Sequence, residues 1–184
     1  NKDWFDPNLK NVFKKFNFPF YFMDFETITQ GVPLIKNTQP YEALPFQWSV
    51  HKWESIDKEI DDGKSFLKFT DQDIERQFVE TLLEAVGDNG TIFAHNAKWV
   101  EIRILNLLKN KDSCMDLANK IDKIIDRVED SLILSRMNFY SPKMNGEWKI
   151  KSIIKAIPDC PVSYDGQDNI GGGDEAQLAW FIYT

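Results

Sequence analysis

The first part of the chain contains three apolar stretches that predict β-strands. Residues 19–26 hold aromatic and other β-forming side chains without an internal breaking residue. In residues 46–54, FQWSVHKWE, apolar and polar positions alternate, which is typical of a strand with one buried face. Residues 61–69, DDGKSFLKF, predict a turn into a third strand, which completes a meander. The glycine and prolines of residues 30–45 indicate a connecting loop.

The apolar spacing then changes to that of helices, with one short strand between them. A helix is predicted to open at Asp71 and to end at Gly87. Its apolar positions recur at helical spacing and are Ile74, Phe78, Leu82 and Ala85. Residues 90–96, GTIFAHN, predict a short buried strand, and residues 97–110 predict a helix. The apolar face of that helix comprises Trp99, Ile102, Leu105 and Leu108.

Shorter helices are predicted in the last part of the chain. Residues 115–125 and 146–158 have helical patterns, and Pro158 ends the second of them. A glycine run at residues 171–173 leads into a final helix from Asp174. Three early strands followed by helix, strand and helix predict an α/β fold, in which a mixed β-sheet is flanked by helices.

Length and composition are those of one globular domain with a sizeable core. The chain has 184 residues, of which 42% are hydrophobic and 28% charged. We expect a lead-in segment at residues 1–17 and the domain at residues 18–184. The 22 basic and 29 acidic residues give a net charge of −7, which argues against tight binding of nucleic acid through overall charge. A local basic groove or a metal-mediated contact with phosphates remains compatible with that charge.

The remaining composition suits a cytoplasmic protein. Cys114 and Cys160 form neither a metal motif nor a disulfide framework, which is typical of reduced thiols. No stretch approaches the ~20 consecutive apolar residues of a transmembrane helix, so we expect no membrane partner. Because the chain starts at Asn1 and stops in the apolar run AQLAWFIYT, we expect a piece of a longer protein whose other domains are partners.

Two carboxylates stand unusually close together at the end of the first predicted strand. Asp24 and Glu26 are two residues apart, so their side chains point to the same face of the strand. Such a pair repels unless a cation lies between its members, and oxygen ligands of this kind suit Mg²⁺ or Mn²⁺. A two-metal site that cleaves a phosphodiester needs about four carboxylates. A solvated strand end is the alternative interpretation of the pair.

Three other segments carry polar side chains at the ends of predicted strands or helices. Asn96 follows the strand in GTIFAHNAKWVEIRIL, and Asp130 precedes a helical start in DRVEDSL. Asp174 and Glu175 stand at a predicted helix N-terminus in GGGDEAQLAWF. The segment KMNGEWKIK, which includes Lys149 and Lys151, is a candidate for tracking a nucleic-acid backbone, or equally a solvated helix start.

The motifs FMDFET, AHNAKW, RVEDSL and DEA, in this order, resemble the DEDD, or DnaQ-like, 3′–5′ exonuclease superfamily. The segments YEALPFQWSVH and YSPKMNGEWKIKSI are similar to a bacterial branch described as a domain of unknown function. The resemblance covers roughly residues 18–180. It implies a ribonuclease H-like fold and a metal-dependent exonuclease that hydrolyses phosphodiester bonds at the ends of single-stranded DNA or RNA.

The resemblance also implies roles for individual residues. Asp24 and Glu26 would be the first metal ligands, with Asp24 bridging two Mg²⁺ or Mn²⁺ ions. Asp130 would be the third-motif ligand, and Glu175 or its neighbour Asp174 the late acid. The implied contacts with substrate or with the second motif come from Asn96 and Trp99, joined by the candidate patch of Lys149 and Lys151.

Two departures from the superfamily pattern bear on activity. Val100 stands where an acid should follow the aromatic residue, so we expect one metal ligand to be lost and the second metal to be weakened. Glu101 is one residue later, a step of about 100° on a helix, and is expected to point away unless the chain is locally irregular there. The usual His or Tyr base is also absent ahead of the last acid, where Ile170 and Gly171 stand.

These departures keep two further functions open. The domain could be a catalytically inactive ribonuclease H-like module that binds nucleic acid or protein, or a structural domain in a larger nuclease or helicase. We expect His95 to be a packed, hydrogen-bonded residue rather than a catalyst, and Trp48 to belong to the core.

Overall fold

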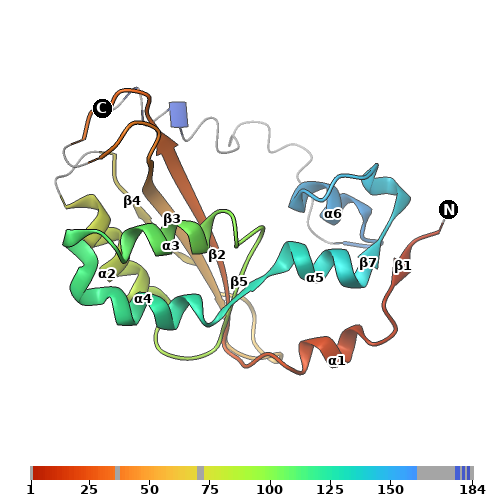
Figure 1. Cartoon of the computed structure of the whole chain (residues 1–184). Helices are drawn as coiled ribbons and strands as arrows, with labels where there is room; N and C mark the ends of the chain where they lie inside the picture. Colours follow the sequence, from red (N-terminus) through yellow and green to blue (C-terminus); the bar gives the residue numbers. More distant parts are fainter. Residues whose placement is uncertain are drawn as a thin grey trace.

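The computed structural model describes residues 2–35, 38–69 and 73–160, together with Gln177, Leu178, Trp180 and Ile182. Two unequal lobes lie side by side along the molecule (Figure 1). The larger lobe contains β2 (Phe20–Thr29), β3 (Ala43–Trp53), β4 (Lys64–Leu67), α2 (Ile74–Val86), β5 (Thr91–Ala94), α3 (Glu101–Leu108), η1 (Asp112–Leu117), α4 (Ala118–Ile125) and β6 (Val128–Asp130). The smaller lobe contains β1 (Trp4–Phe5), α1 (Leu9–Phe13), α5 (Ser131–Asn138), β7 (Phe139–Tyr140), η2 (Pro142–Met144) and α6 (Ile150–Ala156).

Within the described residues, five strands form one mixed sheet in the order β4-β3-β2-β5-β6. Strand β3 is antiparallel to both of its neighbours, whereas β5 is parallel to β2 and β6 is parallel to β5. The early meander and the later helical crossover were both predicted. The predicted fold class is thereby confirmed, since this mixed α/β arrangement is compatible with a ribonuclease H-like fold.

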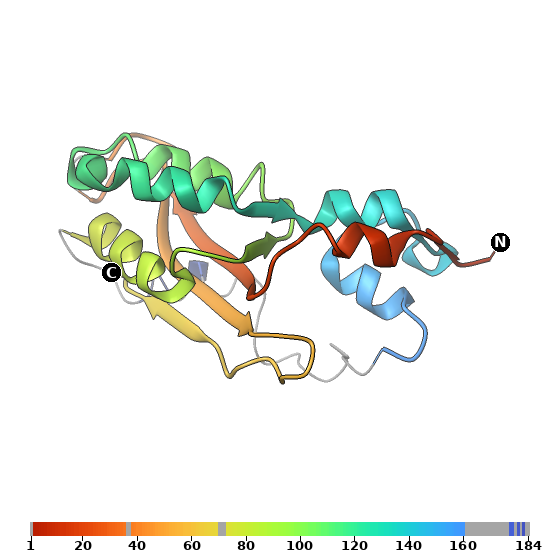
Figure 2. The ribbon, with the colours of Figure 1, turned by 90° about the horizontal axis from the view of Figure 1, so that it is seen from below.

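The alternation along the central strands gives the sheet two different faces. One face of β2 carries Tyr21, Met23 and Phe25, which are buried against β3 and under α2, α3 and α4. Trp48 of β3 joins this core as predicted, and its indole nitrogen donates to Thr81 on α2. The opposite face of β2 lies toward the smaller lobe, on the other side of the sheet from the main core (Figure 2).

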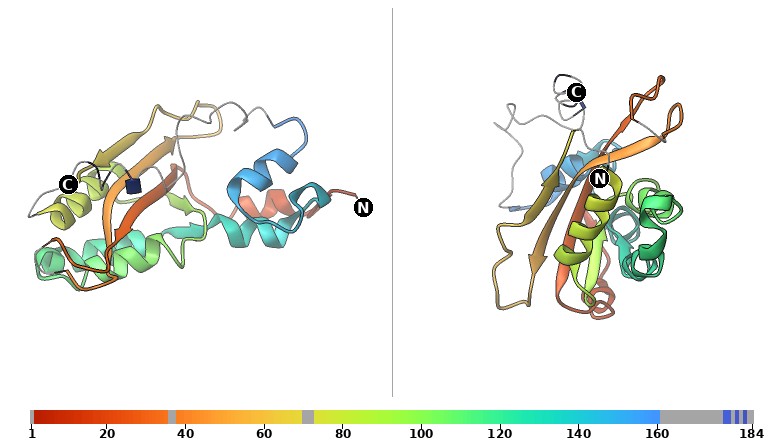
Figure 3. Two further views of the ribbon diagram at one scale, coloured as in Figure 1. Left: turned by 90° about the horizontal axis from the view of Figure 1, so that it is seen from above. Right: turned by 90° about the vertical axis from the view of Figure 1, so that its left-hand side faces the viewer.

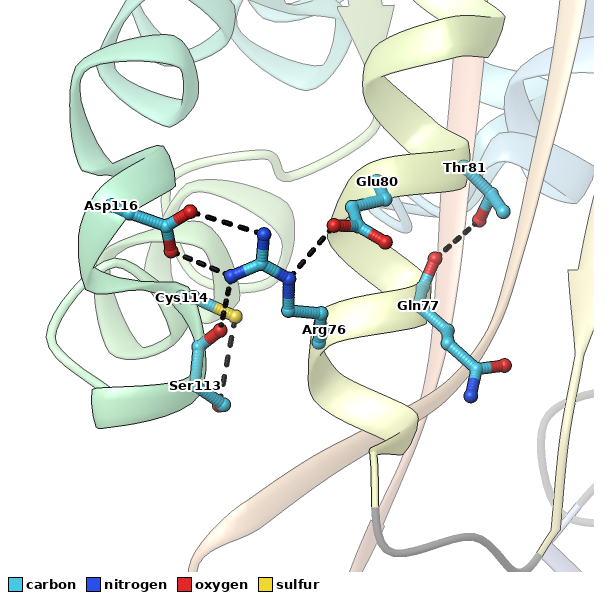
Figure 4. Close-up of polar contacts among 7 residues, drawn as sticks. All are labelled: Arg76, Gln77, Glu80, Thr81, Ser113, Cys114 and Asp116. Atoms are coloured by element: carbon cyan, nitrogen blue, oxygen red, sulfur yellow. Dashed lines mark hydrogen bonds and ion pairs between the residues drawn. The ribbon is translucent and has the colours of Figure 1, made fainter.

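Helix α2 is fixed to the segment η1 by a surface arginine (Figure 4). The guanidinium of Arg76 donates to both carboxylate oxygens of Asp116, to the carbonyl of Ser113 and to Glu80. Because these groups are largely exposed, their ion pairs add little stability and mainly fix geometry. Helices α2, α3 and α4 lie over one face of the sheet (Figure 3).

The smaller lobe joins the N-terminal segment to the chain that follows the sheet. Strand β1 pairs antiparallel with β7, and the rings of Phe5 and Phe139 lie 4.7 Å apart. The buried hydroxyl of Ser141 donates to Asp3. Residues 1–17 were predicted to be a lead-in segment, and those described belong to this folded lobe.

Several element boundaries differ from the predicted ones. Strand β3 begins at Ala43 and includes Pro45, which was assigned to a loop. The helix expected over residues 97–110 begins only at Glu101, and Trp99 is 66% exposed instead of buried on its apolar face. Asp71 lies outside the described residues, as do residues 171–173.

Candidate functional site

Three acids meet where neighbouring parallel strands end. Asp24 lies on β2, Glu101 begins α3 just after β5, and Asp130 is the last residue of β6. The pairing of β2 with β5 ends at Phe22, so the backbone beyond it is not paired with β5. Crevices outside the carboxyl ends of parallel strands are the usual ligand sites of α/β sheets, which makes this acid cluster the candidate site.

Glu101 is the most perturbed acid of the acid cluster. Its side chain is only 1% exposed, and its Oε2 atom has no hydrogen-bond partner. Burial, followed by the charges of Asp24 and Asp130, raises the pKa of Glu101 to about 8, although hydrogen bonds with the backbone of Glu101 and Phe25 oppose the shift. A buried carboxyl oxygen without a partner is costly, which points to a functional reason for its position.

The expectation that Glu101 points away from the other acids is therefore wrong. Residues 95–100 form turns, and Val100 is the N-cap residue of α3 rather than part of the helix. The extra residue before Glu101 is absorbed in these turns, where Asn96 adopts a positive φ of 65°. Asparagine tolerates that conformation, so the Asn96 position was the sequence signal for an irregular start.

Asp130 links two of the strand ends through backbone groups. Its Oδ1 atom accepts from the N–H of Leu132 at 2.9 Å and of Ile133 at 3.4 Å, which caps α5. The same carboxylate accepts from the N–H of Asn96 at 3.1 Å and of Lys98 at 3.4 Å. Asp130 thus holds the turn that places Glu101, and Asn96 takes part through its main chain.

Asp24 and Glu26 occupy successive outward positions on β2. Asp24 pairs with Ser49 and Glu26 with Gln47, and the bulge in β2 comes only after Glu26. Desolvation by the surrounding chain raises the pKa of Asp24, while a hydrogen bond with the Phe25 backbone and the electrostatic effect of His95 oppose it. The Asp24 side chain keeps contact with solvent, because it lies at the wall of an open pocket.

The acid cluster matches the chemistry of a divalent cation without forming a ready-made cage. Carboxylate oxygens are the ligands that Mg²⁺ and Mn²⁺ prefer, and the unpaired Oε2 of Glu101 is a buried oxygen that lacks a positive partner. Over the described ranges, no three His, Cys, Asp or Glu side chains are grouped closely enough to hold a metal as they stand. The predicted late acids Asp174 and Glu175 lie outside those ranges.

His95 has both ring nitrogens occupied, as expected of a packed residue. Nε2 lies 2.9 Å from the carbonyl oxygen of Trp148, which can only accept, so Nε2 carries a proton. Nδ1 lies 3.1 Å from the hydroxyl of Ser131. His95 therefore ties the end of β5 to α5 and to the segment before α6, and it contacts the pocket beside Asp24.

The other residues predicted to contact substrate lie on exposed positions. Trp99 stands in the turn held by Asp130, and the ammonium of Lys98 lies 5.5 Å from the centre of its ring. Lys149 is the N-cap residue of α6, and Lys151 is exposed in the first turn of that helix. The two lysines thus belong to the smaller lobe rather than to the sheet.

A pocket of about 770 Å³ lies between the outward face of the sheet and the smaller lobe. Its sheet side comes from Phe20, Phe22 and Asp24 of β2, Ser49, His51 and Trp53 of β3, and Phe93 to His95. Its other side comes from Phe5, Leu9, Val12, Phe13, Ser131, Leu134, Ser135, Asn138, Phe139, Ile150, Ile153, Ile154 and Ile157. Sequence reasoning did not predict this pocket, because its walls come from segments far apart in the chain.

Comparison with known proteins gives a family but no relative of known function. A family model described as Domain of unknown function (DUF2779) matches residues 21–149, well over half of the chain. No curated protein matches the chain, and neither does any solved structure. None of the helices described is both long and apolar enough to cross a membrane.

Proposed function

The chain belongs to the Domain of unknown function (DUF2779) family, and from its site we propose that it is a metal-dependent phosphodiesterase of the 3′–5′ exonuclease type. Its substrates would be the ends of single-stranded DNA or RNA. The order of its acidic motifs, which resembles the DEDD superfamily, supports this proposal, as does the ribonuclease H-like sheet that carries them.

One observation carries the proposal, namely the buried carboxyl of Glu101, whose Oε2 atom has no hydrogen-bond partner and whose pKa is raised by the charges of Asp24 and Asp130 in addition to burial. The charges of Asp24 and Asp130 raise the pKa of Glu101, and such a group of acids is a poor structural arrangement unless a cation offsets its charge. Elsewhere in the chain, the acid Asp116 has a cationic side chain, Arg76, as its partner.

The cation would be Mg²⁺ or Mn²⁺, held by Asp24, Glu101 and Asp130. Glu26, and Glu175 or Asp174, are the further ligands for a second ion. Divalent cations in such sites supply water activated for attack and neutralise the charge of the phosphate. The side chains of the acid cluster would have to come closer together on binding, because they form no ready-made group.

The surrounding residues would position the substrate. Asp130 fixes the turn that carries Asn96 and Trp99, and an exposed tryptophan next to a lysine is suited to stacking on a base. Lys149 and Lys151, at the start of α6, would contact the phosphate backbone of the nucleic acid. Neither set of contacts distinguishes DNA from RNA.

Calorimetric titration with Mn²⁺ tests the cation site directly. Wild type should bind with an affinity that falls at least about tenfold in Glu101→Gln and in Asp24→Asn. The matched control is Glu84→Gln, since Glu84 is an exposed acid on α2 outside the acid cluster. Equal binding by all four proteins would refute the assignment of the site.

The same proteins, incubated with end-labelled single-stranded DNA and RNA, test the activity. Stepwise shortening that requires Mn²⁺ and is lost in Glu101→Gln is the expected result. The occupied nitrogens of His95 favour a second function, because they leave no described base beside Asp24. Metal binding without shortening would therefore indicate a non-catalytic ribonuclease H-like module.

A further inference from the structure

The pocket between the two lobes has the size of a small-molecule site and an unusual lining. Its volume of about 770 Å³ lies within the range of roughly 300–1,000 Å³ that is typical of ligand pockets. Large apolar side chains remain partly uncovered on its walls, including Phe22 at 38% exposure and Phe13 at 44%. Exposed aromatic rings that converge in a concavity indicate an occupant that covers them.

Charge limits what that occupant is. Among the described residues that line the pocket, none is Lys or Arg, and Asp24 is the only carboxylate. A phosphate held in the body of the pocket would find no cationic partner and one repelling acid. The pocket therefore takes the uncharged part of a ligand. The anionic part of the same ligand lies outside the pocket, where a cation at the acid cluster would neutralise it.

The pocket floor has one polar end and one apolar end. The paired residues Asp24 and Ser49 form its polar end, beside the acid cluster. Phe20 and Trp53 form the opposite end, four residues away, or about 13 Å along the strand. The ring of Phe22 lies between them, stacked on the ring of Phe93 with centres 5.9 Å apart. Flat aromatic surfaces of this kind favour a planar ring over an alkyl chain.

The wall opposite this floor includes the N-terminal segment. Leu9, Val12 and Phe13 of α1 contact the pocket, as does Phe5 of β1. All four precede residue 21, where the match to the DUF2779 family begins. This part of the wall consequently lies outside the residues that match the family model.

We propose that this pocket binds the base and sugar of a substrate nucleotide, with the N-terminal segment serving as a specificity wall. The proposal rests on the proposed function, because the phosphodiester of that nucleotide would lie at the acid cluster. It makes the N-terminal segment part of substrate recognition and assigns Phe22 and Phe13 as the surfaces that contact the base.

Binding of a fluorescent nucleotide tests the pocket without requiring catalysis. The probe is 2-aminopurine nucleoside 5′-monophosphate, whose fluorescence is quenched when the base stacks, titrated with Mn²⁺ present. Ribose 5-phosphate, which lacks a base, should compete about 5- to 100-fold more weakly than the unlabelled nucleotide. Similar competition by both compounds would overturn the proposal.

Substitution of the two exposed rings locates the binding. Phe13→Ser and Phe22→Ser should each weaken probe binding about 5-fold or more. The matched control is Trp4→Ser, because Trp4 is an exposed aromatic of the same segment that does not line the pocket. Circular dichroism and thermal melting confirm that each variant is folded, and unchanged binding by both folded phenylalanine variants would refute the pocket assignment.

Failure of the pocket and failure of the proposed function give different results. If strands are shortened in a manner that requires Mn²⁺, yet neither phenylalanine variant alters the probe or the shortening, the exonuclease stands and the pocket assignment falls. If the probe binds and depends on Phe13 and Phe22 while no strand is shortened, the pocket stands and the catalytic proposal falls. Displacement of the probe by octanoate but not by the unlabelled nucleotide would assign the pocket to an apolar chain and overturn the inference.

Discussion

Replacement of Glu101 by glutamine should remove a pH dependence from the folding stability of this chain. The Glu101 carboxyl has an ordinary pKa of 4.5 and a pKa of about 8 in the folded protein. Between these values the folded state binds the proton more tightly than the unfolded state. The free energy of unfolding therefore falls as pH rises, and the loss is complete once the pH exceeds about 8.

The magnitude follows from the size of the shift. Each unit of pKa difference is worth about 1.4 kcal/mol, so the full shift corresponds to about 5 kcal/mol. Two of those units lie between about pH 6 and the folded-state pKa of about 8. Between about pH 6 and about pH 9 the free energy of unfolding of the wild type should therefore fall by about 3 kcal/mol more than that of Glu101→Gln. Glutamine keeps the shape of the side chain but carries no titrating proton.

Urea unfolding at these two pH values, with EDTA present, measures the effect. Subtracting the free energy of unfolding of the variant from that of the wild type removes the contribution of all other titrating groups. Glu84→Gln serves as the control for loss of one negative charge. A wild-type loss equal to that of Glu101→Gln within about 0.5 kcal/mol would refute the reasoning. Adding Mn²⁺ at about pH 9 should restore stability to the wild type more than to Glu101→Gln, because the cation binds the ionised carboxylate.

Three further substitutions have outcomes that the structure fixes. Asp130→Ala removes the cap of α5 and the acceptor for the turn after β5, and should cost about 1–3 kcal/mol by urea unfolding; a cost near zero would show that these hydrogen bonds do not hold the turn. Arg127→Ala removes donors to the carbonyls of Val86, Gly87, Asn89 and Gly90, and should lower stability by about 2–4 kcal/mol in thermal melting, whereas a change below about 1 kcal/mol contradicts the importance of this contact. Gly90→Ala should destabilise by more than about 2 kcal/mol, since φ there is +85° and a Cβ atom would lie 2.1 Å from the carbonyl oxygen of Pro19; a melting temperature equal to that of wild type would refute the clash.

The sequence was sufficient to predict the sheet because local pattern and burial agree there. The aromatic run of β2 and the alternation in β3 mark strands whose inner faces are buried, as found for Phe25 and Trp48. Pro45 falls within β3 even though prolines usually mark loops. It pairs with Thr27 across the bulge that follows Glu26, and bulges are among the places where strands tolerate proline.

The candidate site was only partly predictable because its geometry depends on a contact between distant residues. Helical spacing placed Glu101 away from the other acids, on the assumption that the helix begins directly after β5. The carboxylate of Asp130 instead takes the N–H groups of Asn96 and Lys98 into a turn, which delays the helix. Residues more than thirty positions apart make that contact, so no local pattern reveals it.

The same delay explains why Trp99 was misplaced. Counted as a helical position, it shares the apolar face with Leu105 and Leu108, which are buried as expected. In the turn it faces solvent beside Lys98. The sequence singled out Asp24 and Asp130, whereas the place of Glu101 beside them required the structure.

One of the connections between the two lobes lies at Asp130, a member of the acid cluster. In the described part of the chain, the two lobes are joined covalently at the lead into β2 and at the step from Asp130 into α5 (Figures 1 and 2). Any rotation of the smaller lobe against the sheet would therefore involve the backbone at Asp130. Asp130 also accepts from the N–H groups of Asn96 and Lys98, so such a rotation would act on the turn before Glu101, and the position of the smaller lobe is coupled to the geometry of the acid cluster.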